Sequence, residues 1–141
     1  MATKHKENLK QRIIEEMTVD YSNVLEKNFE LARQFIRITK DGKVEVLNKE
    51  KLNGTDQIML YLIGKLYAKE AGFIPTDDAS NRELMDELGI PKGSLLPWQK
   101  SLRDQNRIKQ VKKGKIVNHA IATNAVEKAL KGVEKKLQKH G

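Results

Sequence analysis

The chain has 141 residues, 38% of them hydrophobic, 33% charged and 5% aromatic, which suits one modest core packed mainly by aliphatic side chains. It has no cysteine, which excludes disulfides, thiolate nucleophiles and cysteine-ligated zinc, and its three histidines lie far apart. Because the sequence has no run of signal-peptide or membrane-span character, we expect a soluble cytoplasmic protein with no membrane partner.

The net charge of +8 is concentrated in one short segment. Residues 1–91 carry fourteen basic and sixteen acidic residues, whereas residues 92–115 carry eight basic residues and one acidic residue. Residues 116–141 add a net charge of +3. A basic block of this kind indicates a polyanionic partner, although a solvated surface without any partner would have the same composition.

The first predicted helix covers residues 7–36. Thr18 or Asp20 could cap a second helix and so divide this segment in two. Apolar residues recur every three or four positions and form one stripe, which we expect to be buried. The stripe consists of Leu9, Ile13, Ile14, Met17, Val24, Leu25, Phe29, Ala32, Phe35 and Ile36.

A hairpin and a central helix follow. Residues 35–47 alternate apolar and polar side chains on either side of the pair Asp41-Gly42, which supplies the positive φ angles of a tight turn. Residues 55–72 form the most hydrophobic segment of the chain, with Thr55 as a suitable N-cap and Gly72 as a helix stop. This segment predicts a helix at the centre of the core.

Two short helices joined by a tight turn are predicted next. Ser80 or Asn81 caps the first helix, Gly89 ends it, and the stretch 91–94 (PKGS) turns the chain. The inward residues of this helix and its turn are Leu84, Met85, Leu88 and Ile90. The pattern is that of a helix, a glycine-containing turn and a helix.

The second helix of the pair is predicted to begin late, with Ser94 as its N-cap. This start leaves Pro97 in the first turn, where its missing amide costs little, whereas a start near Pro91 would make Pro97 a kink. Leu96 then points outward. Trp98 is interpreted as a core residue, the alternative being an exposed anchor for another protein; it shares the inward face with Leu95 and Leu102.

A basic ribbon and a last helix complete the chain. The segments RIKQV and IVNHAI predict two strands joined by the turn KKGK, with His119 as a structural residue or a phosphate contact. Thr123 or Asn124 would cap the helix that follows. Its apolar seam could pack on the body of the protein or on a second copy in a dimer, and consists of Val126, Leu130, Val133 and Leu137.

Motifs for enzymatic chemistry are missing from the sequence. There is no Walker-type or dinucleotide-binding motif, and no spacing suggests a catalytic triad or a pair of catalytic carboxylates. The stretch 76–78 (TDD) is best explained as a capping and turn element. We therefore expect no catalytic activity, no cofactor and no metal site.

Three helices followed by a basic hairpin resemble a winged helix-turn-helix domain, most closely that of archaeal transcription regulators. The resemblance covers about residues 55–121, and the motif ELMDELGIPKGSL carries most of it. It implies a mainly α fold with small β-hairpins, in which helices flank the winged helix-turn-helix domain on both sides. The three parts are an N-terminal helix and hairpin extension (1–52), the winged domain (53–121) and a C-terminal helix (122–141).

The resemblance also implies a surface for DNA. The second helix of the pair, about 94–106, would enter the major groove, and the ribbon, about 108–121, would be the wing that grips backbone or minor groove. Gln and Arg can read base edges, while Ser and Lys more often hold phosphate. On the helix the outward residues would be Lys92, Ser94, Gln99, Lys100 and Arg103. The basic residues after it would be Arg107, Lys109, Lys112, Lys113 and Lys115.

These observations predict a duplex DNA-binding protein that regulates transcription. We expect it to act as a homodimer through the N-terminal helix, the C-terminal seam or both, because half-site recognition usually comes from paired modules. The alternative is a winged-helix module for protein interaction within a larger assembly. Leu96 would contact the partner protein in that alternative, and a thymine methyl group in a DNA complex.

Overall fold

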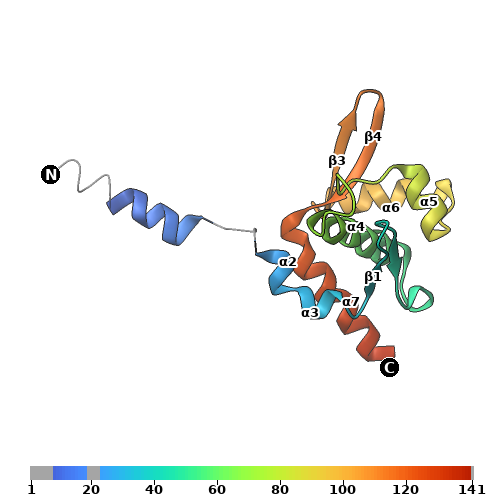
Figure 1. Ribbon diagram of the computed structural model, residues 1–141, viewed down its shortest axis with the longest axis horizontal. Helices are drawn as coiled ribbons and strands as arrows, with labels where there is room; N and C mark the ends of the chain where they lie inside the picture. The colour runs from blue at the N-terminus through green and yellow to red at the C-terminus, as the bar shows by residue number, and fades with distance from the viewer. Residues whose placement is uncertain (1–7, 19–22, 141) are drawn as a thin grey trace.

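The structure, a computed structural model, describes residues 8–18 and 23–140 (Figure 1). It is mainly helical with two small antiparallel β-hairpins, as the sequence predicts. A helical segment over 8–17, which ends in the π-helical turn η1 (Ile13–Met17), stands apart from the rest. The remaining elements pack around one long helix and share a single hydrophobic core.

A continuous helix over residues 7–36 is not observed. The alternative division near Thr18 is closer to the structure, although Thr18 ends the first helical segment and does not cap a second described helix. Beyond η1 there are two one-turn helices, α2 (Val24–Lys27) and α3 (Phe29–Ala32), and strand β1 (Ile36–Ile38) then begins. Asn28 separates the two turns, because its side chain donates to the Val24 carbonyl (2.8 Å) and so favours a helix end over a continuing helix. A helix start at Asp20 lies outside the described residues.

The predicted first hairpin is confirmed. Strand β1 pairs with β2 (Val44–Val46) in an antiparallel register that places Ile36 opposite Val46. Only Gly42 in the turn has a positive φ angle (87°), whereas Asp41 accepts a hydrogen bond from the Thr39 hydroxyl. The hairpin then leads through the 3₁₀ turn η2 (Lys49–Lys51) into the central helix.

The central helix α4 (Gly54–Glu70) is buried along most of its length, as predicted. Its N-cap is Asn53 rather than Thr55, because the Asn53 Oδ1 accepts the Asp56 amide at 2.8 Å. The helix ends before Gly72, whose φ angle is 81°. Gly64 lies directly against the first hairpin, since a Cβ atom there would be 2.3 Å from Val44 Cγ1.

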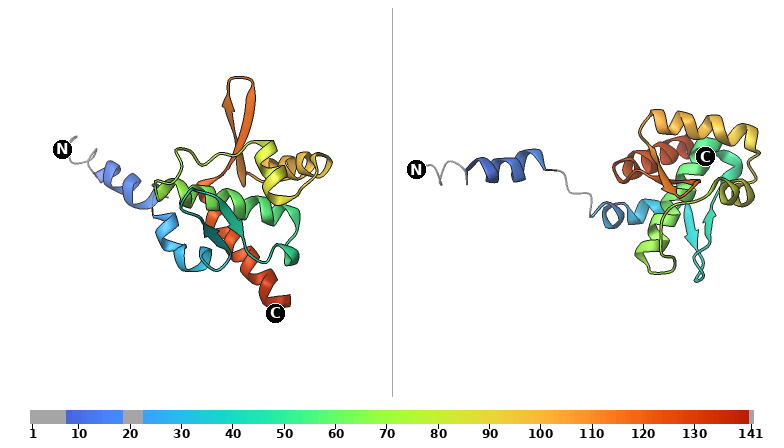
Figure 2. Two further views of the ribbon diagram at one scale, coloured as in Figure 1. Left: turned by 45° about the vertical axis from the view of Figure 1, so that its right-hand side comes forward. Right: turned by 90° about the horizontal axis from the view of Figure 1, so that it is seen from above.

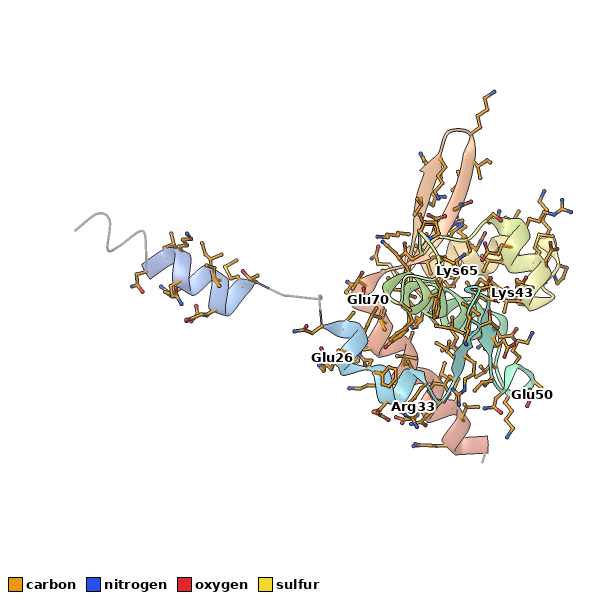
Figure 3. All side chains as sticks on the ribbon, viewed as in Figure 1. Glu26, Arg33, Lys43, Glu50, Lys65 and Glu70 are labelled. Carbon is orange, nitrogen blue, oxygen red and sulfur yellow. The ribbon has the colours of Figure 1, made fainter. Side chains whose placement is uncertain are left out.

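Helix α5 (Asn81–Leu88) has the predicted boundaries. Ser80 is its N-cap, and Gly89 ends it in the left-handed region with a φ angle of 66°. Glu83 fixes α5 to α4, because its carboxylate accepts hydrogen bonds from the Tyr61 hydroxyl (2.6 Å) and from the Lys65 ammonium (2.8 Å). Lys65, labelled in Figure 3, therefore lies on the side of α4 that faces α5.

The predicted late start of the next helix is wrong, since α6 (Lys92–Asp104) begins directly after Pro91. The Pro91 carbonyl accepts the amides of Ser94 and Leu95 at 3.0 Å each, and these bonds form the first turn. Pro97 therefore lies inside the helix and leaves the Gly93 carbonyl without its helical donor. Gly93 and Pro97 are both exposed, so water can hydrate that carbonyl.

The second ribbon is also confirmed, but its turn is shorter than the predicted KKGK, because Lys112 and Lys113 belong to the first strand. Strands β3 (Ile108–Lys113) and β4 (Ile116–Ile121) form six antiparallel pairs, and the turn between them contains Gly114 with a φ angle of 64°. The views in Figures 1 and 2 agree that this β3–β4 ribbon projects from the body beside α6.

Helix α7 (Val126–His140) packs on the core of its own chain. Val126, Leu130 and Val133 are fully buried, and Leu137 is partly buried against the same core. Of the two alternatives for this seam, packing on the body is therefore the one observed, and the seam is not free for a dimer. The predicted caps at residues 123–124 lie inside the 3₁₀ turn η3 (Thr123–Ala125), which leads into α7.

Candidate nucleic-acid interface

Helix α6 and the β3–β4 ribbon are joined by a chain of polar side chains. Gln99 and His119 are buried, and Asn81 and Arg103 are half-buried. Gln99 Nε2 lies 2.9 Å from Asn81 Oδ1 and 3.3 Å from His119 Nδ1. On the other side of the imidazole, Arg103 Nη1 lies 3.0 Å from His119 Nε2. His119 is only 3% exposed, so of its two predicted roles the structural one is observed.

The protonation of His119 follows from these contacts. Burial, reinforced by the Arg103 charge, lowers the pKa of His119, so the imidazole is neutral at pH 7. Because a guanidinium can only donate, Nε2 must accept and the proton must sit on Nδ1. Gln99 Oε1 is a buried oxygen without a hydrogen-bond partner among the described residues. The Nδ1 proton is satisfied once the oxygen and nitrogen of the Gln99 amide are exchanged, and the Asn81 amide must be exchanged with it so that its nitrogen, not its oxygen, faces Gln99 Oε1.

The prediction that Gln99 points outward is wrong, since its side chain is 1% exposed. Gln99 follows Leu95 by four residues and precedes Leu102 by three, and both leucines are fully or almost fully buried. These spacings place all three side chains on the inward face of α6. Trp98 also packs against the core, which confirms its interpretation as a core residue.

The other α6 residues predicted to contact DNA differ in their exposure to solvent. Lys92 and Lys100 are exposed, whereas Ser94 and Arg103 are half-buried. Lys100 pairs with Asp104 at 2.9 Å, but both side chains are more than half exposed, so this ion pair is weak and leaves the lysine available. Leu96 is 43% exposed, as predicted.

Within the candidate interface, the ribbon presents most of the exposed lysines that form no ion pair with a described residue. Lys109, Lys112 and Lys115 are exposed, and none of them forms an ion pair with a residue that the structure describes. Arg107, at the base of the ribbon, is half-buried and directs its guanidinium toward the Met59 sulfur (4.0 Å). The ribbon surface therefore carries three lysines without such an ion pair, with Lys109 near its inner end and Lys112 and Lys115 near its outer end.

Lys113 differs from the other ribbon lysines because it braces the ribbon against the body. Its Nζ lies 3.0 Å from Oδ2 of Asp78, whose side chain is 7% exposed, and Asn118 donates to the other oxygen at 2.8 Å. Burial alone would raise the pKa of Asp78, but the hydrogen bonds from Asn118 and Lys113 outweigh it and lower the pKa. The neighbouring Ala79 also pairs with His119 through two backbone hydrogen bonds.

Asp78 is the residue of this region that sequence reasoning interpreted only as part of a turn. No pattern in the sequence links it to Lys113 and Asn118, which follow it by 35 and 40 residues. Of the ten predicted contact residues, four basic ones are exposed without an ion pair to a described residue: Lys92, Lys109, Lys112 and Lys115.

Comparison of the chain with protein-family models, with curated protein sequences and with solved structures found no match. Over the described ranges, no helix has the length and apolar character needed to cross a bilayer. The same part of the chain contains no group of three or more His, Cys, Asp or Glu side chains placed to hold a metal ion. The interface is therefore defined by the residues and geometry given above.

Proposed function

We propose that this protein binds double-stranded DNA through a winged helix-turn-helix domain over about residues 53–121 and regulates transcription. Helix α6 would lie toward the major groove, and the β3–β4 ribbon would be the wing. The order α4, α5, glycine turn, α6 and ribbon supports this assignment. The left-handed Gly89 supports it too, because it turns the chain sharply between α5 and α6.

One observation carries the proposal: a braced ribbon carries Lys109, Lys112 and Lys115 into solvent without counter-ions from the described part of the chain. A two-stranded ribbon fits a DNA groove, and each lysine placed near a phosphate releases condensed counterions. The contacts of Asp78 and His119 hold the ribbon in place before binding, which lowers the entropy lost in the complex.

The composition of the interface favours backbone contacts over base reading. Gln99, the best candidate for reading adenine, is buried, and Arg103 donates to His119. The exposed polar residues of α6 are chiefly lysines, which hold phosphate without demanding one geometry. We therefore propose duplex binding in which phosphate contacts supply most of the affinity.

Fluorescence anisotropy of a labelled random duplex tests the proposal. Binding should weaken steeply between about 50 and 200 mM salt. The double variant Lys112→Glu/Lys115→Glu should nearly abolish binding, whereas Lys40→Glu/Lys43→Glu should have a small effect. The second pair is a matched control, because it changes the charge equally at exposed lysines in and beside the turn of the first hairpin. Absence of binding at the lower salt, or equal losses in both variants, would overturn the proposal.

A second candidate function rests on Leu96. This leucine is 43% exposed on α6, and its neighbours Gly93 and Pro97 are exposed as well. An exposed apolar surface at the start of a helix is better suited to binding another protein than to contacting phosphates. If α6 binds a protein, Leu96→Ala should abolish capture of that partner and leave the affinity for random duplex almost unchanged.

A further inference from the structure

The helix over 8–17 carries an apolar stripe that nothing in the described structure covers. Leu9, Ile13, Ile14 and Met17 are 57%, 43%, 51% and 76% exposed. Figure 1 shows this helix clear of the body. Four large apolar side chains within ten residues favour a helix whose stripe is covered, since a helix this short is marginal on its own in water.

The body has a groove of matching character on α2, α3, β1 and the end of α4. It consists of two adjoining hollows of about 340 and 720 Å³, which share Phe29 and Tyr67 as lining residues. Phe29 is 49% exposed, and Ile36 and Ile38 line the smaller hollow. The two hollows therefore form one groove with an apolar floor that runs across α2, α3, β1 and the end of α4.

The charges around the groove change sign along its length. Glu26, Glu30 and Glu70 line the larger hollow, while Arg33 and Arg37 line the smaller one. Figure 3 shows Glu26 and Glu70 toward the α2 side of the body and Arg33 further along, near α3. A segment that fits this groove should be basic at one end and acidic at the other.

The helix over 8–17 has that charge distribution. Lys10 and Arg12 lie in its first half, and Glu15 and Glu16 lie in its second half. Lys10 precedes Ile14 by four residues, so it lies on the same side of the helix as part of the stripe. The stripe and its flanking charges therefore match the apolar lining and the two charged ends of the groove.

We propose that the helix over 8–17 of one copy of this chain docks in the groove of a second copy, and that the exchange is reciprocal. Each chain carries both surfaces, so two copies satisfy both helices and both grooves in a closed two-fold arrangement. The seam of α7 cannot serve this purpose, because it is buried in its own chain. The inference does not depend on DNA binding.

Two complementary variants test the exchange. Ile13→Asp/Ile14→Asp changes only exposed residues of the helix and keeps the groove, whereas Phe29→Asp changes an exposed groove residue and keeps the helix. Each variant alone should raise the dimer dissociation constant at least about 30-fold, the effect of losing a hot spot. An equal mixture should form a heterodimer held by one of the two contacts, because the intact helix of one variant meets the intact groove of the other. Its dissociation constant should lie between those of the parent dimer and of either variant alone.

Sedimentation velocity of the intact chain measures the dimer dissociation constant. Concentrations of about 1–200 µM cover the range in which a moderate dimer affinity is measurable. A fluorescent label on Lys115→Cys marks one variant, since the chain has no other cysteine. Ile116→Glu is the control, because it places an acid at a 61% exposed apolar residue on the ribbon and should leave the dimer unchanged. The inference is overturned by a monomer at every concentration or by a Phe29→Asp protein that still dimerises. A mixture that fails to associate would also overturn it.

Discussion

Lys136 Nζ in the last helix lies 2.7 Å from Oδ2 of Asp56 in the first turn of the central helix. The Asp56 side chain is 6% exposed and that of Lys136 is 46% exposed, so the lysine supplies the charge that a buried carboxylate requires. This ion pair joins two segments that are 80 residues apart in sequence. It complements the apolar seam that packs α7 on the core.

Replacement of Lys136 by methionine should therefore destabilise the protein. The variant keeps most of the apolar stem but leaves the Asp56 carboxylate without its partner, and we expect a loss of about 1–2 kcal/mol, reduced by the partial exposure of the lysine. Lys135→Met is the control, because Lys135 is exposed and forms no ion pair with a described residue. Urea denaturation at pH 7 measures both, and equal stabilities of the two variants would contradict the prediction.

A methyl group at Gly54 should have a large effect, because this residue touches the Trp98 ring. A Cβ atom at Gly54 would be 2.1 Å from Trp98 Cζ3, which forces the indole or the start of α4 to move. We expect Gly54→Ala to cost about 1–3 kcal/mol, as overpacked sites do. The emission of Trp98, the only tryptophan, should shift as well.

Gly132→Ala provides the matched comparison within the same fold. Apart from the neighbouring backbone of α7, no atom of the described residues lies within 4 Å of a Cβ built at this position, and alanine favours a helix by about 0.5–1 kcal/mol relative to glycine. This variant should therefore be more stable than the parent protein in urea. A stabilising effect of Gly54→Ala would show that Trp98 is not held in the core as described.

His119 should make the stability depend on pH in a defined window. Its pKa is lowered in the folded state by burial and by Arg103, so the unfolded chain binds this proton more readily. The contribution of neutral His119 to the free energy of unfolding should be fully present above about pH 6.5, the pKa of an unperturbed histidine. It should be lost as the pH decreases toward the pKa of His119 in the folded state. Denaturant titrations from pH 7.5 to pH 5 should show this loss in the parent protein and a smaller one in His119→Gln.

Lys112 and Lys113 are neighbours on β3, but their roles should differ. On the proposed function, Lys112→Met removes one phosphate contact and should reduce the slope of log K against log salt by about 0.9. Lys113→Met should instead lower stability, because it removes the partner of buried Asp78. Anisotropy titrations at several salt concentrations distinguish the two variants, and equal changes in slope would show that Lys113 also contacts DNA.

Local signals in the sequence predicted much of the fold. Ser80 and Gly89 mark the ends of α5, the alternation around Asp41-Gly42 predicted the first hairpin, and the segments on either side of KKGK predicted the second, because caps and tight turns depend on residues close in sequence. The start of α6 was mispredicted because Pro97 suggested a boundary, whereas the exposed side of a helix tolerates the lost hydrogen bond.

Contacts between residues that are distant in the sequence could not be predicted from it. The exposed stripe of the helix over 8–17 has the same periodicity as a buried one, since periodicity shows that a helix has an apolar face but not what covers it. The contacts of Asp78 with Asn118 and Lys113 depend on how the ribbon folds back on the loop before α5. Gln99 is a different case, because its spacing from Leu95 and Leu102 already indicated the inward face.

The ladder of the β3–β4 ribbon sets how far the proposed wing can reach. The inner end of the ribbon is anchored by Ile108, His119, Ala120 and Ile121, which are all buried. The outer three pairs, from Val111↔Asn118 to Lys113↔Ile116, extend the ribbon by about 10 Å at the usual rise per residue. This length is close to the depth of a B-DNA groove, about 8 Å. Each added or deleted residue pair would change the reach by about 3.4 Å, so on the proposed function the length of this hairpin would set how deeply the wing enters the groove.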